Sequence, residues 1–279
     1  MSKGSIRFRQ GKRQLSPTLV IGWVYDEVLL PGIYQLEAMR RFGVPIINDA
    51  LTLLSGQNKY INSAMLHKEL VPHMDVFSGT SVEEALNFAD RVGYPVVSKP
   101  IVGFGGNGLA RYSNPGDLKQ ALLDLPRLTQ VYLVPFIRNP GRDIRVTCVN
   151  FHPVFAFYRN APDGSWITNM DSGGVAEPAP LDAELIRVAS RAAQSANARF
   201  AGVDVVEDLD ADGAYRVFEV NTCPSTIPPV LREFADFISC AASDFAAALR
   251  DWKPSHVFES PAMDSELFFK GWRVAESVQ

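Results

Sequence analysis

Apolar residues recur at helical spacing in several stretches of the chain. This spacing predicts helices at residues 32–41, 58–69, 81–91, 182–198 and 230–249. A strand-helix unit is expected over residues 19–42, followed by a strand at residues 44–48. In the last predicted helix, one apolar stripe is expected to be core, and it comprises Leu231, Phe234, Phe237, Ile238, Ala241 and Phe245.

One expected β-hairpin carries polar side chains among apolar neighbours. Residues 202–206 and 215–220 are rich in β-branched and aromatic residues, and Asp-Ala-Asp-Gly between them is a strong turn signal. A turn centred in this tetrapeptide puts Asp204 opposite Glu219, and the two-residue period of a strand puts Asn221 on the same face. Two carboxylates and an amide suit Mg²⁺, which takes its other ligands from water and phosphates. The hairpin therefore predicts a metal site for nucleotide chemistry.

The same hairpin also matches the calcium-loop pattern D-x-D-x-D-G-x5-E. The matching positions are Asp208, Asp210, Asp212, Gly213 and Glu219. An EF-hand needs a helix on each side, whereas a strand-like segment precedes this loop and several prolines follow it. The flanks therefore disfavour an EF-hand, and we expect the three aspartates to form a solvated hairpin tip.

A glycine-rich segment follows another expected strand. Gly103, Gly105 and Gly108 match G-x-G-x-x-G, but no helix is expected after them, as a dinucleotide-binding fingerprint requires. Leu109 stands where a P-loop would have its lysine. We therefore expect a mobile loop between two antiparallel strands, with backbone N–H groups that cover phosphates. Lys99, just before the loop, would bind phosphate, although a lone strand lysine is commonly just solvated.

In this order, the motifs resemble those of an ATP-grasp enzyme of the RimK-type carboxylate-amine ligase group. After the lysine and the glycine loop come Gly-Arg-Asp-Ile-Arg at 141–145, Trp-Ile-Thr-Asn at 166–169, Gly-Gly at 173–174, Gly-Val-Asp at 202–204 and Phe-Glu-Val-Asn at 218–221. The similarity covers about residues 20–250. It implies an α/β (α+β) ATP-grasp fold, in which two α+β lobes clasp ATP behind a short α/β N-terminal domain.

The resemblance also implies domain boundaries and site residues. The expected domains are an N-terminal domain at 1–57, a first lobe with the glycine flap at 58–134, a second lobe with the metal site at 135–250, and a tail at 251–279. The implied nucleotide-binding residues are Lys59, Lys99, Gly103, Gly105, Gly106, Gly108, Phe136, Ile137, Asp143 and Asn169. Phe136 and Ile137 would lie in the hinge between the lobes, where backbone groups read adenine.

For the chemistry itself, the resemblance implies two arginines and a metal. Arg145 and Arg159 would be catalytic and would face the reacting carboxylate and the γ-phosphate. Asp204, Glu219 and Asn221 would hold one or two Mg²⁺ ions, with Mn²⁺ as an alternative. ATP is thus the implied cosubstrate.

The chain departs from the family pattern at a few positions. Pro135 stands before the hinge aromatic, where an acid or glutamine is usual, and it offers a carbonyl but no N–H. Asn58 replaces the usual aspartate before the first lysine. Ser172, next to acidic Asp171, stands where a basic residue commonly precedes the paired glycines. These changes bear on adenine binding and on the substrate charge that the site prefers.

Composition limits the partners and the location. The chain has 279 residues, of which 47% are hydrophobic, so two or three lobes with a large core are expected. The net charge of −4 argues against a nucleic-acid binder. The basic residues at 1–18 are expected in a disordered or strand-forming terminus, with an interaction arm as the alternative. Residues 19–25 are too short to span a membrane, so we expect a cytoplasmic protein without a membrane partner.

The three cysteines show no metal-ligand spacing and indicate a reducing compartment. Cys148 and Cys240 are expected in the core. Cys223 lies two residues after Asn221, but a nucleophilic cysteine needs a nearby base, which the sequence does not show. A nucleophile at this position is therefore disfavoured.

Three functions compete at this stage. The first is an ATP-dependent ligase that joins a carboxylate to an amine through an acylphosphate and releases ADP and phosphate; its partners would be small-molecule or peptide acids and amines. The second is a phosphotransferase or cyclising enzyme on the same scaffold. The third is a non-catalytic nucleotide-binding module, which the metal ligands and both lysines disfavour. The sequence leaves the identity of the substrates and the formation of a homo-oligomer open.

Overall fold

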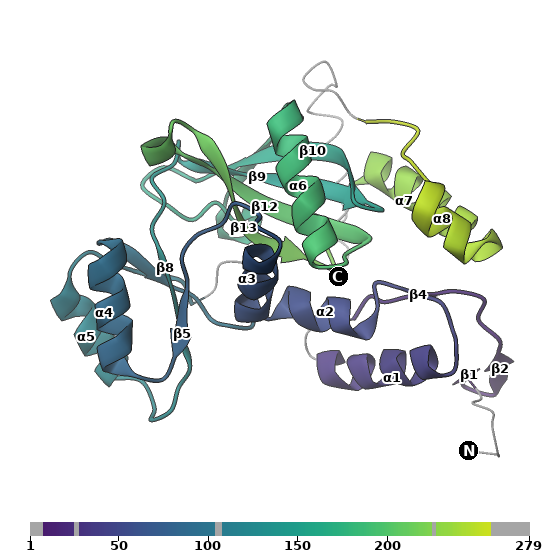
Figure 1. The fold of residues 1–279 in the computed structure, drawn as a ribbon, viewed down its shortest axis with the longest axis horizontal. Helices are drawn as coiled ribbons and strands as arrows, with labels where there is room; N and C mark the ends of the chain where they lie inside the picture. Colours follow the sequence, from purple (N-terminus) through teal and green to yellow (C-terminus); the bar gives the residue numbers. More distant parts are fainter. Residues whose placement is uncertain (1–7, 25–27, 104–107, 225–226, 258–279) are drawn as a thin grey trace.

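The chain folds into a small N-terminal unit and two lobes that each contain a sheet (Figure 1). The computed structural model describes residues 8–24, 28–103, 108–224 and 227–257. Within these residues, no helix is long and apolar enough to cross a membrane.

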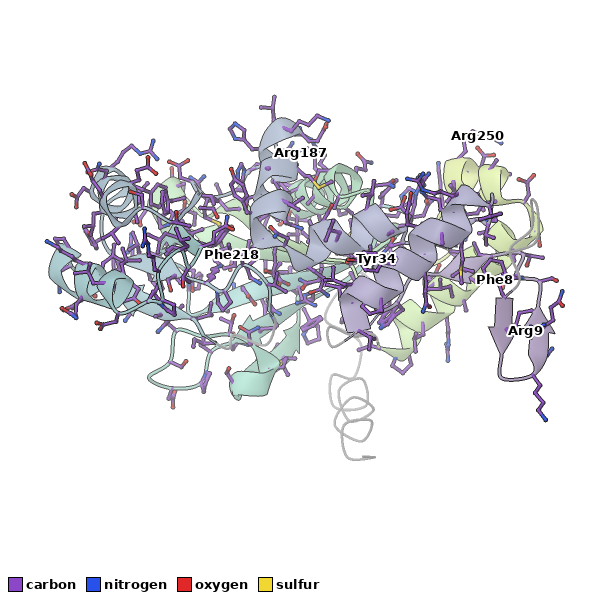
Figure 2. The ribbon with its side chains drawn as sticks, turned by 90° about the horizontal axis from the view of Figure 1, so that it is seen from below. Phe8, Arg9, Tyr34, Arg187, Phe218 and Arg250 are labelled. Atoms are coloured by element: carbon purple, nitrogen blue, oxygen red, sulfur yellow. The ribbon has the colours of Figure 1, made fainter. Side chains whose placement is uncertain are left out.

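The N-terminal unit contains one parallel strand pair and two helices. Its elements are β1 (Phe8–Gln10), β2 (Arg13–Leu15), β3 (Val20–Ile21), α1 (Leu29–Arg41), β4 (Ile46–Ile47) and α2 (Ala50–Gln57). Val20 pairs with Ile46 in parallel, which confirms the predicted strand-helix-strand order. The hairpin β1–β2 lies at one end of the molecule, where Phe8 and Arg9 are labelled (Figure 2). Helix α2 was not predicted; Asp49 caps it by accepting a hydrogen bond from the backbone N–H of Thr52 at 2.9 Å.

The first lobe is an antiparallel sheet covered by two helices. Its elements are β5 (Phe77–Gly79), α4 (Val82–Val92), β6 (Val96–Ser98), β7 (Ala110–Tyr112), α5 (Pro115–Leu123) and β8 (Val131–Pro135). Helix α3 (Lys59–Lys68), which precedes them in the chain, packs on the second lobe, where Leu66 joins the core. The strand order is β5-β8-β6-β7. Strands β6 and β7 are antiparallel, as predicted for the strands on either side of the glycine loop. Helix α5 was missed, because Asn114 and Pro115, which resemble a turn, are here the N-cap and first residue of a helix.

The second lobe is a five-stranded antiparallel sheet in the order β11-β10-β9-β12-β13. Its elements are β9 (Arg142–Val149), β10 (His152–Asn160), the 3-10 turn η2 (Met170–Ser172), β11 (Val175–Pro178), α6 (Ala183–Ser195), β12 (Phe200–Asp208), the 3-10 turn η3 (Leu209–Ala211), β13 (Ala214–Asn221), α7 (Pro228–Ser243) and α8 (Phe245–Asp251). Alternation along the strands gives each face its own core. Ile144 and Cys148 join the cluster around α6, whereas Phe155 and Phe157 join the cluster around α7 and α8.

Some details of the predicted scaffold are wrong. The helix predicted at residues 230–249 is two helices, separated at Asp244, which caps α8 through the N–H of Ala247 at 2.9 Å. Leu231 is 46% exposed and therefore does not belong to the core stripe. Cys148 is buried as predicted, but Cys240 is exposed, because it lies on the outer side of α7. Of the expected tail at residues 251–279, residues 258–279 lie outside the described residues, and Trp252 at its start is buried in the core cluster of α7 and α8.

Candidate active site

A cavity between the two lobes brings together most of the predicted site residues. The predicted residues that line it are Lys59, Lys99, Gly103, Phe136, Ile137, Asp143, Arg159, Asn169, Asp204 and Glu219. They come from α3, from the segment after β6, from the connection that follows β8, from the sheet of the second lobe and, for Asn169, from the connection between β10 and β11. Gly108 is described next to the loop, but Gly105 and Gly106 lie outside the described residues.

Two lysines enter the cavity, one from α3 and one from the segment after β6. Lys59 is the first residue of α3, which Asn58 caps through the N–H of Ile61 at 3.0 Å. Its Nζ donates to the carbonyl of Gly103 at 2.8 Å and lies 3.5 Å from a carboxylate oxygen of Glu219. Because a helix N-terminus and an ammonium group both attract anions, this corner suits a phosphate.

Lys99 follows β6 directly, and its backbone N–H extends the sheet to the carbonyl of Tyr132 at 3.1 Å. Its Nζ lies 4.6 Å from the centre of the Phe218 ring. Burial lowers the pKa of Lys99, and Glu219 opposes that shift in part. Among the described residues, no carboxylate forms an ion pair with Lys99 within 4.0 Å. This cation is therefore available to an anionic ligand.

The β12–β13 hairpin pairs Asp204 with Glu219, as predicted. Near the turn, however, the strands run one residue out of the predicted register, with Val205 opposite Val217. A β-bulge at Phe218 restores the expected pairing. A strand lies on each side of the turn, so the loop is not an EF-hand. The solvated tip was predicted wrongly for Asp208, which is 5% exposed because it pairs with Arg216.

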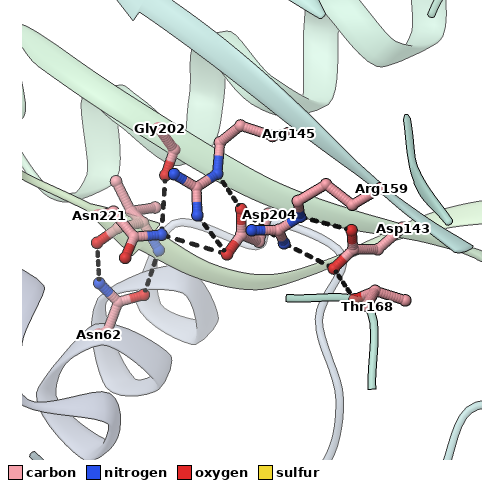
Figure 3. Close-up of polar contacts among 9 residues, drawn as sticks. Asn62, Asp143, Arg145, Arg159, Thr168, Gly202, Asp204 and Asn221 are labelled. Carbon is pink, nitrogen blue, oxygen red and sulfur yellow. Dashed lines mark hydrogen bonds and ion pairs between the residues drawn. The ribbon is translucent and has the colours of Figure 1, made fainter. Parts of the chain in front are cut away.

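Charged side chains from three neighbouring strands form a continuous row across the sheet (Figure 3). Arg159 on β10 donates to the two carboxylate oxygens of Asp143 on β9 at 2.7 and 2.6 Å. The same guanidinium lies 3.2 Å from Asp204 on β12. Arg145 on β9 donates to Asp204 from Nε and from Nη2, the latter at 3.0 Å. Each acid in the row thus has a cation beside it.

The row fixes the charge of its buried members. Burial disfavours ionised Asp204, but Arg145 and Arg159 outweigh it and hold the pKa of Asp204 below its usual value. Burial likewise disfavours charged Arg159, but Asp143 and Asp204 keep the pKa of Arg159 above its usual value. Asp143 also accepts a hydrogen bond from Thr168 Oγ1 at 2.8 Å. With its oxygens bonded to Arg159 and Thr168, Asp143 holds Arg159 in position.

Asp204, Glu219 and Asn221 are the predicted ligands of Mg²⁺. Glu219 lines the cavity, and its side chain is 23% exposed. Asn221 lies behind Asp204, and its amide donates to the Asp204 carboxylate and to the Gly202 carbonyl, at 3.2 Å in each case. The described residues contain no cluster of three or more His, Cys, Asp or Glu side chains that could hold a metal. Two carboxylates and an amide nevertheless fit Mg²⁺, which completes its shell with water and phosphates.

The connection between the lobes contains Phe136 and Ile137, directly after β8. The backbone N–H of Phe136 donates to the carbonyl of Pro95 at 2.9 Å. The carbonyl of Ile137 accepts the amide of Asn139 at 3.0 Å. The Phe136 ring packs edge-to-face against Trp166, with ring centres 6.0 Å apart. These contacts make an apolar end to the cavity, opposite in character to the charged row.

Sequence reasoning missed several residues at this site. The further lining residues are Val97, Pro100, Leu109, Val134, Pro135, Asn139, Trp166, Ile167, Thr168 and Phe218. Trp166 and Thr168 belong to the motif from which only Asn169 was assigned a role, so the motif itself could have indicated them. Arg145 was predicted at the site but does not line the cavity, because it lies behind Asp204.

A cavity between two α+β lobes, lined by two lysines and by a row of alternating arginine and aspartate side chains, is the kind of site that binds a nucleoside triphosphate. Residues 56–228 match the model of the RimK-like ATP-grasp domain. The chain belongs to this family. The ATP-grasp fold and the resemblance predicted from the motifs are therefore confirmed.

Curated relatives are named as ligases that act on acids and amines. The tetrahydromethanopterin:alpha-L-glutamate ligase of Methanosarcina acetivorans is 31% identical over 216 residues, which cover 68% of this chain and 66% of the relative. The alpha-aminoadipate–LysW ligase LysX of Saccharolobus solfataricus is 31% identical over 191 residues, which cover 67% and 68%. The chain thus spans about two thirds of the length of these relatives.

Solved structures share the fold. An ATP-grasp ligase, PsnB, in complex with a minimal precursor, Mg and ADP, superposes with a TM-score of 0.62 at 19% identity, and the match covers 90% of this chain and 84% of PsnB. The D-cycloserine synthetase DcsG superposes with a TM-score of 0.59 at 19% identity and covers 75% and 76%. At 19% sequence identity, the similarity to these structures shows the fold alone.

Proposed function

We propose that the protein is an ATP-dependent ligase that joins a carboxylate to an amine through an acylphosphate and releases ADP and phosphate. The observation that carries this proposal is that one cavity is lined both by two lysines and by an arginine with two carboxylates. These residues are Lys59, Lys99, Arg159, Asp204 and Glu219. The ligase names of the curated relatives support it. The substrates would be small-molecule or peptide acids and amines, without nucleic acid or membrane.

Each predicted residue has a place in the proposed reaction. Lys59 and Lys99 would bind ATP phosphates, while Phe136 and Ile137 would contact the adenine. Mg²⁺, or Mn²⁺ in its place, would neutralise phosphate charge when bound to Asp204, Glu219 and Asn221.

Activation is needed because a carboxylate is a poor acceptor for an amine. The acid oxygen attacks the γ-phosphorus, ADP leaves, and the resulting acylphosphate is attacked by the amine, which expels phosphate. Arg159 would face the carboxylate and then the oxyanion, with Asp143 holding its guanidinium in place. Arg145 would act beside it once its contact with Asp204 rearranges. Asn169, on the cavity wall, would sit beside the phosphates.

Trapping with hydroxylamine tests the proposal. With ATP, Mg²⁺ and a panel of acids, the substrate acid should give a hydroxamate, because a small amine can attack an acylphosphate in an open site. Arg159→Ala should lower the yield while ATP affinity stays close to that of the wild type. A stable phosphorylated product that hydroxylamine does not consume would favour a phosphotransferase instead. ATP binding without stimulation of ADP formation by any acid would favour a non-catalytic module.

The proposal includes the predicted domain boundaries at residues 57, 134 and 250, and a location in a reducing cytoplasm. Cys148 and Cys240 are free cysteines, as a reducing compartment would allow. Size-exclusion chromatography with light scattering would establish whether the protein forms a homo-oligomer.

A further inference from the structure

A second cavity of about 290 Å³ lies between the N-terminal unit and the second lobe. It is lined by the connection from α1 to α2, by the turn before β12, and by α8. It shares no lining residue with the ATP cavity. Arg199 lines this cavity directly before β12 and precedes Asp204 by five residues, which corresponds to roughly 17 Å along the strand at a rise of ~3.3 Å per residue.

One wall of the second cavity carries a cation without a counter-charge. Arg199 is half-buried, and burial lowers its pKa. Its Nη1 donates to the Leu249 carbonyl at 2.8 Å and to Asn150 Oδ1, both of which are neutral. Its guanidinium lies 4.2 Å from the centre of the Phe151 ring. In the described part of the chain, no carboxylate pairs with it within 4.0 Å and only Nη1 has a hydrogen-bond partner. Since a partly buried cation gains from a carboxylate, this wall suits an acid ligand.

The other cation of the cavity is already neutralised. Arg40 donates to Glu37 from Nε at 2.7 Å and from Nη2 at 2.9 Å. A doubly charged phosphate would therefore meet one unpaired guanidinium and the carboxylate of Asp49, which repels it. A single carboxylate is the better match.

Asp49 adds a site for an ammonium group. Its Oδ1 caps α2 by accepting the N–H of Thr52 at 2.9 Å, and within the described residues its Oδ2 has no hydrogen-bond partner. Val44, Phe245 and Leu249 supply apolar wall between these polar groups. Carboxylate, ammonium and apolar side chain together define an α-amino acid with an apolar side chain.

We propose that the second cavity binds such an amino acid, with its carboxylate on Arg199, its ammonium on Asp49 and its side chain against Phe245 and Leu249. The site is separate from the proposed ligase chemistry, because a ligand on Arg199, roughly 17 Å along the chain from Asp204, cannot attack an acylphosphate there. The ligand would join α8 to the N-terminal unit.

Calorimetric titration of the full chain without nucleotide tests the proposal. The probes are L-leucine, L-valine and L-phenylalanine, together with two leucine analogues: 4-methylpentanoate, which lacks the ammonium, and L-leucinamide, which lacks the carboxylate. We expect at least one amino acid to bind. If leucine binds, each analogue should bind about tenfold more weakly or worse, because it leaves one charged partner unmatched. Absence of binding by all three amino acids at millimolar concentration overturns the proposal.

Three variants test whether the amino acid binds in the second cavity. Asp49→Asn keeps a residue that can cap α2, and it should weaken amino acid binding about tenfold without weakening the binding of 4-methylpentanoate, which has no ammonium. Leu249→Trp should fill the cavity and abolish binding of both. Arg250→Gln is the matched control, because Arg250 is the neighbouring residue of α8, pairs with Asp251 and points outward (Figure 2). Amino acid binding that survives both Asp49→Asn and Leu249→Trp overturns the assignment. ATP-dependent activity should persist in all three variants, so this outcome is distinct from failure of the ligase proposal.

Discussion

At the scale of single residues, the two carboxylates proposed to bind the metal differ in their burial and in their ion pairs. Asp204 is 5% exposed and contacts both Arg145 and Arg159. Glu219 lines the cavity and contacts Lys59 at 3.5 Å. Substitution of the two residues should therefore have different consequences for stability, although both should damage the reaction.

Glu219→Gln should reduce Mg²⁺-dependent ADP formation on the order of 100-fold with little change in the free energy of unfolding, because it removes a cavity-lining charge without changing size. Asp204→Asn should reduce it equally but also destabilise the fold by about 3 to 5 kcal/mol, since Arg145 and Arg159 lose their shared partner. ADP release and urea unfolding measure the two effects. Wild-type turnover by both variants would show that this hairpin is not the metal site.

Lys99 gives the ATP affinity a dependence on pH. Burial lowers the pKa of Lys99, so in the nucleotide-free protein its charge is lost at a lower pH than that of an ordinary lysine. Because phosphates bind the charged form, ATP affinity should fall as the pH rises through that lowered pKa and be unaffected below it. Lys99→Arg should keep its charge and remove the pH dependence. Titrations of ATP binding from pH 7 to pH 10 would check this, and equal pH profiles for the two proteins would contradict it.

The sequence motifs predicted which residues line the cavity, but they did not predict which side chains contact one another there. Lys59, Lys99 and Glu219 line one cavity, as expected from the order of the motifs. The pairing of Asp204 with Arg145 depends on β9 lying beside β12, and more than fifty residues separate these positions in the chain. No local pattern specifies such a neighbour, so the sequence could not show that the candidate metal ligand also holds the candidate catalytic arginines.

At the scale of elements, the sequence did not predict α2 and α5, because each of these helices begins with residues that are also typical of turns. Asp49 and Asn114 favour both turns and helix N-caps, and local sequence does not decide between these roles. Tertiary packing decides here, since Leu53 of α2 and Leu118 of α5 are each at most 1% exposed. The register of β12 and β13 could likewise be predicted only in part. The pairing of Asp204 with Glu219 was predicted correctly, but the bulge at Phe218 that produces it was not.

Gly202 on β12 makes room for Arg145. A Cβ at Gly202 would lie 2.9 Å from Arg145 Nη1, 3.0 Å from its Cδ and 2.9 Å from the Pro224 Cβ. Gly202→Ala should therefore displace Arg145 and lower the rate of ligation roughly 10- to 100-fold, while ATP affinity changes little. Gly116→Ala is a matched control at the start of α5, where a new Cβ meets only Asn114 Oδ1, at 3.2 Å. Steady-state kinetics with ATP and the acid would show the difference, and an unchanged rate for Gly202→Ala would contradict a role of Arg145 in the reaction.

At the scale of the whole molecule, the N-terminal unit is joined to the second lobe. Ile47 of β4 is 1% exposed and belongs to the same core cluster as Phe200 and Phe237. Asn48 follows it and is 3% exposed. Its Nδ2 donates to the carbonyls of Phe200 at 2.8 Å and Thr222 at 2.9 Å. The predicted boundary at residue 57 therefore separates segments that share a core, and we expect the two parts to unfold together.

Asn48→Ala tests this connection, because the substitution leaves two buried carbonyls and the N–H of Arg199, bonded to Asn48 Oδ1 at 2.8 Å, without that partner. We expect a loss on the order of 3 kcal/mol in the free energy of unfolding, since each buried unsatisfied group costs about 1 to 3 kcal/mol. Asn114→Ala, which removes the exposed cap of α5, should cost only about 1 kcal/mol. Urea unfolding followed by far-ultraviolet circular dichroism and by tryptophan fluorescence should give coincident transitions in the wild type and in both variants. Equal losses for the two variants would show that the link through Asn48 contributes little, and separate transitions in the wild type would show that the two parts do not unfold together.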